Sequence, residues 1–151
     1  MRHRLHKQIE LDQGFTLIEL LVVILIIGVL AAIAIPSFLN QKGKATDAQA
    51  KEMARSGELA AETFSTDNNG EYTGLEPKTL HEYESAIQIA AGNNSAYVSL
   101  AESTEAGKGY TITAKATSGD TFTVTKNATG AVTRTCETKL ANKGGCQTGK
   151  W

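Results

Sequence analysis

The stretch "GFTLIELLVVILIIGVLAAIAIPSF", from Gly14 to Phe38, decides how this chain is built. It holds one charged residue, Glu19, and every residue from 20 to 35 is apolar or glycine. The segment 15–35 covers roughly 21 residues, which as an α-helix would be about 32 Å long and match the ~30 Å hydrocarbon core of a bilayer. The stretch therefore predicts a transmembrane helix.

A secretory signal peptide is the other interpretation of this stretch. Basic residues within 2–7 precede it, and Ala32-Ile33-Ala34 offers the small residues of a cleavage site. Acidic residues within 10–19, and an apolar run that is long for a signal peptide, favour the transmembrane interpretation. Lysines and arginines lie on both sides of the run, so charge alone does not fix the orientation of the helix.

Glu19 is the unexpected residue in this segment. A carboxylate at the centre of a bilayer costs about 2.5 to 3.5 kcal/mol, although one near the end of a span can reach the interface. The alternative is that Glu19 meets a cation. If the bond between Gly14 and Phe15 is cut, Phe15 carries a new α-ammonium, and Glu19 could neutralise that group in its own chain or in a neighbouring subunit.

The residues Gly14-Phe15-Thr16-Leu17-Ile18-Glu19-Leu20, followed by the apolar run and Pro36, resemble the N-terminus of type IV prepilins and of type II secretion pseudopilins. The resemblance is specific from Gly14 to about Leu39. After about residue 75 it is only architectural.

The resemblance implies a pathway of processing and assembly. Residues 1–14 would be a leader that a membrane prepilin peptidase removes after Gly14, and the new amine of Phe15 would be methylated. Glu19 would pair with the Phe15 amine of an adjacent subunit. The leader departs from that of many family members, because Asp12-Gln13 stands near the cut where those have a short basic leader.

Pro36 lies where the apolar run ends. Because proline lacks an N–H, it should kink or locally melt the helix, and with Gly28 it marks a weak stretch that we assign to assembly. That Pro36 simply ends the helix is the alternative. Continuation is favoured because small or apolar residues recur at spacings of three and four. These residues are Leu39, Gly43, Thr46, Ala50, Met53, Gly57, Ala60, Ala61 and Phe64.

We therefore expect one helix to about Ser65. Residues 15–39 would form its transmembrane and polymerisation part, and residues 40–65 its C-terminal half. The charged residues of that half are assigned to a polar surround, basic first and then acidic, which would suit staggered subunits. They are Lys42, Lys44, Asp47, Lys51, Glu52, Arg55, Glu58 and Glu62.

A turn should end the long helix at Asp67-Asn68-Asn69-Gly70, because these residues favour turns. The tetrapeptide is similar to part of a calcium loop but lacks the downstream glutamate, so no metal site is predicted. Residues 66–108 are expected to form a loop between helix and sheet, with a short helix at 79–89 and a possible strand at 96–100.

Three alternating runs at 109–115, 121–125 and 131–135 predict an antiparallel β-meander within residues 109–136. The C-terminal half of the long helix would cover its apolar face. Cys136 and Cys146 should form a disulfide, since a cysteine pair in an exported protein favours this over a metal or redox site, and it would hold the tail 137–151. The predicted fold class is α+β, the pilin fold.

No enzymatic pattern is present in the sequence. There is no phosphate loop or nucleophile elbow, and His81 has no visible catalytic partner. His3 and His6, both in the leader, do not predict a metal site, and no cofactor is expected. A net charge of -1 with scattered lysines and arginines predicts no nucleic-acid site. The glycosylation triplets at 93–95 and 127–129 are of a kind that arises often by chance.

The sequence thus indicates a prepilin that is held in a bacterial membrane, with its N-terminus inside, until it polymerises with copies of itself into an extracellular pilus. By resemblance, its partners would be the prepilin peptidase and an assembly platform with its ATPase. A type II secretion pseudopilin is the near alternative, and a membrane-anchored or secreted small β-rich binding domain is a different one. The sequence does not distinguish a major from a minor subunit, and it is compatible with a role of the filament in adhesion, motility or DNA uptake.

Overall fold

The computed structural model describes residues 14–92, 94–139, 145–146 and 148–151. The leader residues 1–13, with both leader histidines, and Asn93 lie outside this description. The chain divides after Ser37 into two units, the second being Phe38–Trp151. We call this second unit the head.

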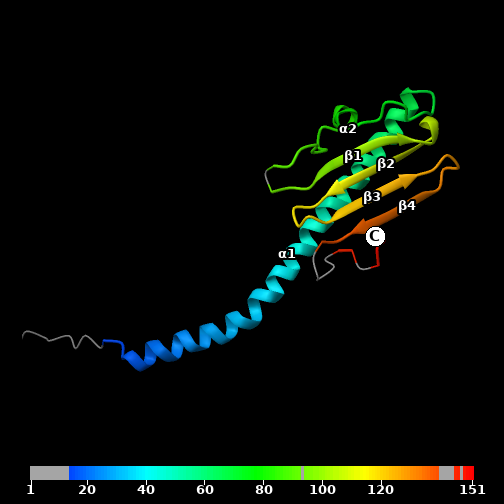
Figure 1. Cartoon of the computed structure of the whole chain (residues 1–151). Helices are drawn as coiled ribbons and strands as arrows, with labels where there is room; N and C mark the ends of the chain where they lie inside the picture. Colours follow the sequence, from blue (N-terminus) through cyan, green and yellow to red (C-terminus); the bar gives the residue numbers. More distant parts are fainter. Residues whose placement is uncertain (1–13, 93, 140–144, 147) are drawn as a thin grey trace, which may run out of the picture. The chain divides into compact units, whose positions relative to one another are not determined.

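Helix α1 runs from Leu17 to Asp67 and includes Pro36 (Figure 1). The interpretation in which Pro36 ends the helix is therefore wrong. The helix ends where the turn residues predict, because Asn69 and Gly70 take positive φ values of 55° and 82°. The Gly70 N–H donates to the Ser65 carbonyl at 2.8 Å, which satisfies one carbonyl of the last turn.

The head contains one antiparallel sheet with strands in the order β1-β2-β3-β4 (Figure 1). Its strands are β1 (Tyr97–Thr104), β2 (Gly109–Lys115), β3 (Thr121–Lys126) and β4 (Val132–Glu137). The 3-10 turn η1 (Glu105–Gly107) joins β1 to β2. In Figure 1 the sheet lies along the head part of α1, so the α+β fold expected from the sequence is confirmed.

Two elements differ from the expected ranges. Strand β1 is longer than the possible strand at 96–100, because its residues up to Thr104 pair with β2. The short helix is α2, Pro77–Tyr83, rather than 79–89. Proline at the first helical position favours this earlier start, and Glu84 takes an extended conformation that ends the helix.

Small residues of α1 form its contact with the sheet. Ala50, Ala54, Ala60 and Ala61 are buried, and a Cβ added to Gly57 would lie 3.0 Å from the Cγ2 atom of the buried Ile112 side chain. The absence of a side chain at Gly57 therefore lets α1 approach β2 closely. The buried part of the predicted small-residue seam begins at Ala50, since Leu39 is exposed and Gly43 and Thr46 are only half-buried.

The polar surround predicted for α1 is wrong at Asp47, which is fully buried with an exposed fraction of 0%. Glu58 and Glu62 also differ from a freely solvated face, because each is bonded to a cation on the sheet. Both carboxylates are paired within the head. They are therefore not free to pair with the basic residues of a staggered neighbouring subunit, as the sequence pattern suggested.

Candidate functional site

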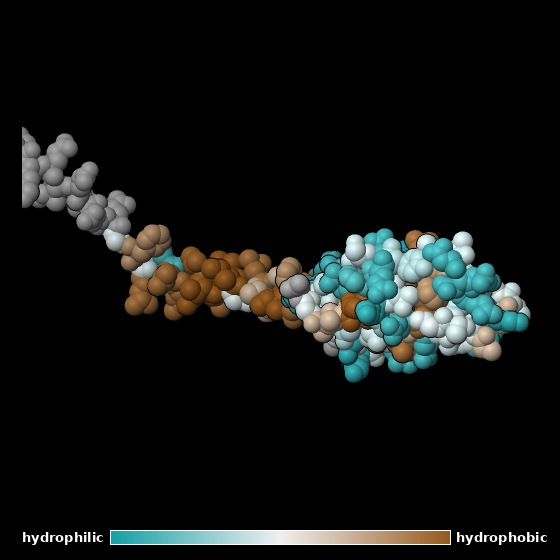
Figure 2. Space-filling view, turned by 90° about the horizontal axis from the view of Figure 1, so that it is seen from above, coloured by the Kyte–Doolittle hydropathy of each residue, from teal (hydrophilic) through white to brown (hydrophobic). Residues whose placement is uncertain are grey.

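The apolar part of α1 is the largest exposed hydrophobic feature among the described residues. Figure 2 shows hydrophobic side chains gathered along the first part of α1, while hydrophilic residues dominate the visible surface of the head. The most apolar 18-residue window of α1 has a mean hydropathy of 3.1 and no buried portion. By length and composition this helix could cross a membrane.

Glu19 caps the start of α1. Its Oε2 atom accepts hydrogen bonds from the backbone N–H and the hydroxyl of Thr16, both at 2.8 Å. In return the Glu19 N–H donates to the Thr16 hydroxyl oxygen at 3.2 Å. This is a capping box, in which a Thr-x-x-Glu sequence satisfies backbone donors at a helix start. In the single subunit the carboxylate is thus held by its own chain.

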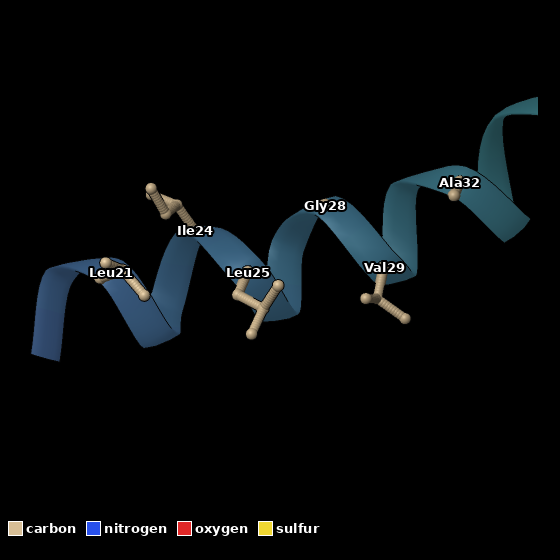
Figure 3. Close-up of a pocket in the computed structure, with 6 residues that line it drawn as sticks. All are labelled: Leu21, Ile24, Leu25, Gly28, Val29 and Ala32. Carbon is tan, nitrogen blue, oxygen red and sulfur yellow. The ribbon is translucent and has the colours of Figure 1, made fainter. Parts of the chain in front are cut away.

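One face of the apolar segment carries a hollow around Gly28. Six residues line it at helical spacings of three and four: Leu21, Ile24, Leu25, Gly28, Val29 and Ala32. Figure 3 shows these residues along the helix, with the Leu25 and Val29 side chains pointing to the same side. A Cβ added to Gly28 would meet no atom within 4 Å, so the subunit itself does not require glycine there.

The remaining site residues from the sequence are placed as follows. Gly14 and Phe15 lie before the first turn of α1, and Phe15 is 87% exposed. Pro36 lies inside α1. Cys136 and Cys146 form the expected disulfide, with 5.7 Å between their Cα atoms.

The head contains a polar cluster that sequence reasoning missed. Lys126 Nζ lies 2.7 and 2.9 Å from the two carboxylate oxygens of Glu62. The hydroxyls of Tyr72 and Tyr110 donate to the same carboxylate at 3.0 and 3.1 Å. The cluster therefore joins α1, β2, β3 and the loop after α1 around one carboxylate.

The cluster shifts the pKa of each of its charged members. Burial by itself would raise the pKa of Glu62, but the hydrogen bonds from Lys126, Tyr72 and Tyr110 and the charge of Lys126 outweigh burial and lower it. Burial would lower the pKa of Lys126, but its bonds to Glu62 and Tyr72 raise it. Burial raises the pKa of Tyr110, and the Glu62 charge adds to this. At neutral pH Glu62 and Lys126 therefore form an ion pair, and Tyr110 keeps its proton.

A second ion pair lies one helical turn earlier. Arg134 Nη2 lies 2.9 and 2.6 Å from the carboxylate oxygens of Glu58. The guanidinium groups of Arg55 and Arg134 each lie over the ring of Trp151, at 5.6 and 5.8 Å from its centre, and the indole N–H donates to the Thr135 carbonyl. This fixes the end of the described tail against β4.

The strand period could have revealed these cations. Lys126 shares its strand face with the buried Phe122 and Val124, and Arg134 shares a face with Cys136. The alternation along β3 and β4 therefore places the side chains of Lys126 and Arg134 on the sheet face that packs against α1. Among the described residues, no group of three or more His, Cys, Asp or Glu side chains is placed to hold a metal ion.

Comparison with known proteins gives the same N-terminal signal. A family profile described as a prokaryotic N-terminal methylation motif matches residues 11–35. The chain is 30% identical over 120 residues to the fimbrial protein EcpC of Eikenella corrodens, and the match covers 74% of this chain and 78% of that protein.

Two further relatives match this chain over shorter segments than EcpC does. The type IV major pilin protein PilA of Myxococcus xanthus is 33% identical over 87 residues, which are 54% of this chain and 40% of PilA. The type II secretion system core protein G of Pectobacterium carotovorum is 42% identical over 58 residues, which are 38% of this chain and 37% of that protein. The chain thus spans less than half the length of these two relatives. No solved structure matches the chain.

Proposed function

This chain belongs to the type IV pilin family, and on that premise we propose that it is the structural subunit of an extracellular type IV pilus, made as a membrane-held precursor. Members of this family are structural subunits rather than enzymes. The proposed cycle begins with cleavage after Gly14 by a prepilin peptidase and methylation of the Phe15 amine. Extraction into the filament would then depend on an assembly platform and its ATPase.

The observation that carries the proposal is the exposed apolar segment of α1, in which no residue of the most apolar window is buried. Such a surface needs lipid around it before assembly and other apolar helices after assembly. Gly28 supports packing against other helices after assembly, because the absence of a side chain on an exposed helix lets a neighbouring helix approach closely. Among the described residues, no atom beyond the adjoining helix backbone lies within 4 Å of the Gly28 Cβ position.

Glu19 has a specific role in this proposal. In the precursor, its carboxylate is held by Thr16, so the capping box reduces the penalty of placing it in an apolar segment. After cleavage, Phe15 carries an ammonium four residues before Glu19. In the filament, the Glu19 carboxylate gives up one or more of its hydrogen bonds from Thr16 and forms an ion pair with the Phe15 ammonium of an adjacent subunit.

A type II secretion pseudopilin is the second candidate. The 42% identity to core protein G favours it, although that match covers only 58 residues. The match to EcpC, a fimbrial protein, extends over 120 residues and so includes much of the head. For this reason we place the pilus first.

Mass analysis of sheared surface filaments tests the proposal. We expect filaments built of a chain that begins at N-methylated Phe15. Gly14→Val should abolish both cleavage and filaments, because the peptidase must bring its active site close to this backbone, whereas Gly92→Val is the control in a loop without neighbours near its Cβ. Efficient cleavage of the Gly14→Val chain, or a mature chain that begins at Ile35, contradicts the proposal.

A further inference from the structure

Asp47 is the first buried residue of α1, and its exposed fraction is 0%. Its two carboxylate oxygens are bonded to two other segments of the head. The Ser118 hydroxyl donates to Oδ1 at 2.8 Å, and the backbone N–H of Gly145 donates to Oδ2 at 2.6 Å. A buried carboxylate is tolerated only with such partners, so Asp47 depends on the turn before β3 and on the tail.

Gly145 makes a second bond to the same helix. The Nζ of Lys51, one helical turn after Asp47, donates to the Gly145 carbonyl at 2.7 Å. A Cβ on Gly145 would lie 3.0 Å from the Asp47 Cβ and 3.2 Å from Lys51 Nζ. A single tail residue thus gives both its N–H and its C=O to α1, at a distance where an added Cβ would force Asp47 or Lys51 to shift.

The disulfide connects this contact to the sheet. Gly145 is adjacent to Cys146, which is bonded to Cys136 in β4, and both cysteines are buried. Before the bond forms, the tail beyond β4 has no covalent restraint that keeps Gly145 beside Asp47.

The beginning of the tail, near Cys136, is also hydrogen-bonded to a buried aspartate. Asp120, also fully buried, accepts a hydrogen bond from the Lys139 N–H at 2.9 Å. Its own N–H donates to the Ser118 hydroxyl at 3.4 Å, so the Asp47 and Asp120 contacts are connected through one serine. The tail is therefore anchored beside both ends of the disulfide-bounded segment.

We propose that oxidation of Cys136 and Cys146 locks the first buried turns of α1, residues 47–54, onto the head. The two thiols lose two protons and two electrons to a disulfide oxidant, which becomes a dithiol, and the new S–S bond presents Gly145 to Asp47 and Lys51. In the reduced chain the Gly145 contacts are lost, and residues 47–54 separate from the sheet while the rest of the head stays folded.

The opening is local because these turns have weaker contacts than later turns. Besides the Gly145 bonds they have the Ser118 hydroxyl on Asp47, the partly buried Met53 against the core, and Lys51 Nζ 5.4 Å from the centre of the Phe122 ring. Their buried side chains are small, at Ala50 and Ala54, and so they contribute little apolar contact. Later turns have Gly57 against Ile112 and the ion pairs of Glu58 and Glu62. Local stability varies along a chain in this way when contacts are uneven. The lock does not depend on polymerisation, so it stands or falls separately from the pilus proposal.

Hydrogen exchange measured by mass spectrometry on the full chain in detergent tests the lock. In the reduced protein, and in the Cys136→Ser/Cys146→Ser variant, we expect amides 48–54 to exchange about tenfold faster or more, since a buried carboxylate has lost one of its donors. Amides of β2 and β3 should keep their protection. Uniform loss of protection in helix and strands, or a change confined to residues 137–151, overturns the proposal.

Variants that keep the disulfide separate the lock from a general effect of cross-linking. Gly145→Val should reproduce the faster exchange of residues 48–54 in the oxidised protein, and subsequent reduction should add little there. Gly92→Val is the matched control, because no atom lies within 4 Å of its Cβ position. Asp47→Asn, which keeps an acceptor for Gly145, should exchange more slowly than Asp47→Ala. Wild-type protection of residues 48–54 in oxidised Gly145→Val contradicts the lock.

Discussion

Lys126 Nζ in strand β3 lies 2.7 Å from Glu62 Oε1 in helix α1, so the sheet and the helix are joined by an ion pair across 64 residues of sequence. The same carboxylate accepts the hydroxyl of Tyr110, a side chain with no exposed surface. Removing Glu62 would leave this buried hydroxyl without its acceptor and Lys126 without its counter-charge.

We therefore predict that Glu62→Ala lowers the free energy of unfolding by about 1 to 3 kcal/mol, the usual penalty for orphaning a buried polar group. Glu62→Gln should lose less, because its amide oxygen can still accept from Tyr110. Glu82→Ala is the control, since its pair with Lys78 is 3.9 Å long and solvent-exposed and should contribute almost nothing. Thermal melts of the three variants measure this. Equal effects for Glu62→Ala and Glu82→Ala would refute it.

The same cluster gives a pH dependence whose sign follows from the pKa shifts. The pKa of Glu62 is lowered from 4.5, so its contribution is full above pH 4.5 and is lost as pH falls through the lower folded-state value. The pKa of Lys126 is raised from 10.5, so its contribution is full below pH 10.5 and is lost as pH rises through the higher folded-state value. The stability difference between wild type and Glu62→Ala should be flat between these limits and shrink below pH 4.5. A difference that grows on acidification would contradict this assignment.

Glycines of α1 should respond with opposite signs to substitution. Gly57→Val should destabilise the head by about 1 to 3 kcal/mol, because the added atoms meet the fully buried Ile112. Gly43→Ala, with nothing within 4 Å of its Cβ position, should raise stability by up to about 1 kcal/mol through helix propensity. Denaturant unfolding of both variants measures this. A Gly57→Val protein as stable as wild type would show that α1 does not approach β2 so closely.

Gly28 should matter for the filament and not for the subunit. Gly28→Leu is expected to leave expression, membrane insertion and processing unchanged, because a Cβ at this position meets no described atom beyond the adjoining helix backbone within 4 Å. Filament yield should fall, since a large side chain keeps neighbouring helices apart. Ile27→Leu, a conservative change at an exposed position, is the control. If Gly28→Leu yields as many filaments as Ile27→Leu, the face around Gly28 is not a packing surface.

Local patterns in the sequence were enough to predict α1, its end and the antiparallel sheet. The helix periodicity, the Asp67-Asn68-Asn69-Gly70 turn and the alternation along β2 and β3 all act within a few residues. The capping box could also have been predicted, because Thr16-x-x-Glu19 has the required spacing at the start of a helix.

The missed features depend on contacts between distant residues. An aspartate among charged helix residues is ordinarily solvated, and the burial of Asp47 follows from Gly145, which lies 98 residues away. Strand β1 was only partly predicted because its residues from Leu100 to Thr104 do not alternate cleanly, and their pairing with β2 decides their conformation. The pairing of Glu62 depends on Lys126, 64 residues away in β3, so the helix pattern alone predicts a solvated carboxylate.

Glu19→Gln is the most direct test of the proposed pairing between Glu19 and the Phe15 ammonium of an adjacent subunit. Glutamine retains the capping box with Thr16 but carries no charge, whereas Glu19→Leu loses both and Glu19→Asp keeps the charge on a shorter arm. Without the carboxylate, the Phe15 ammonium would be buried in the apolar filament shaft without a partner, which destabilises each such contact by about 3 to 5 kcal/mol. The measurement is the yield of sheared filaments relative to processed subunit in the membrane. We expect normal processing of Glu19→Gln and Glu19→Leu with few filaments from either, and an intermediate yield from Glu19→Asp. Wild-type filament yield from Glu19→Gln would show that the carboxylate only caps its own helix.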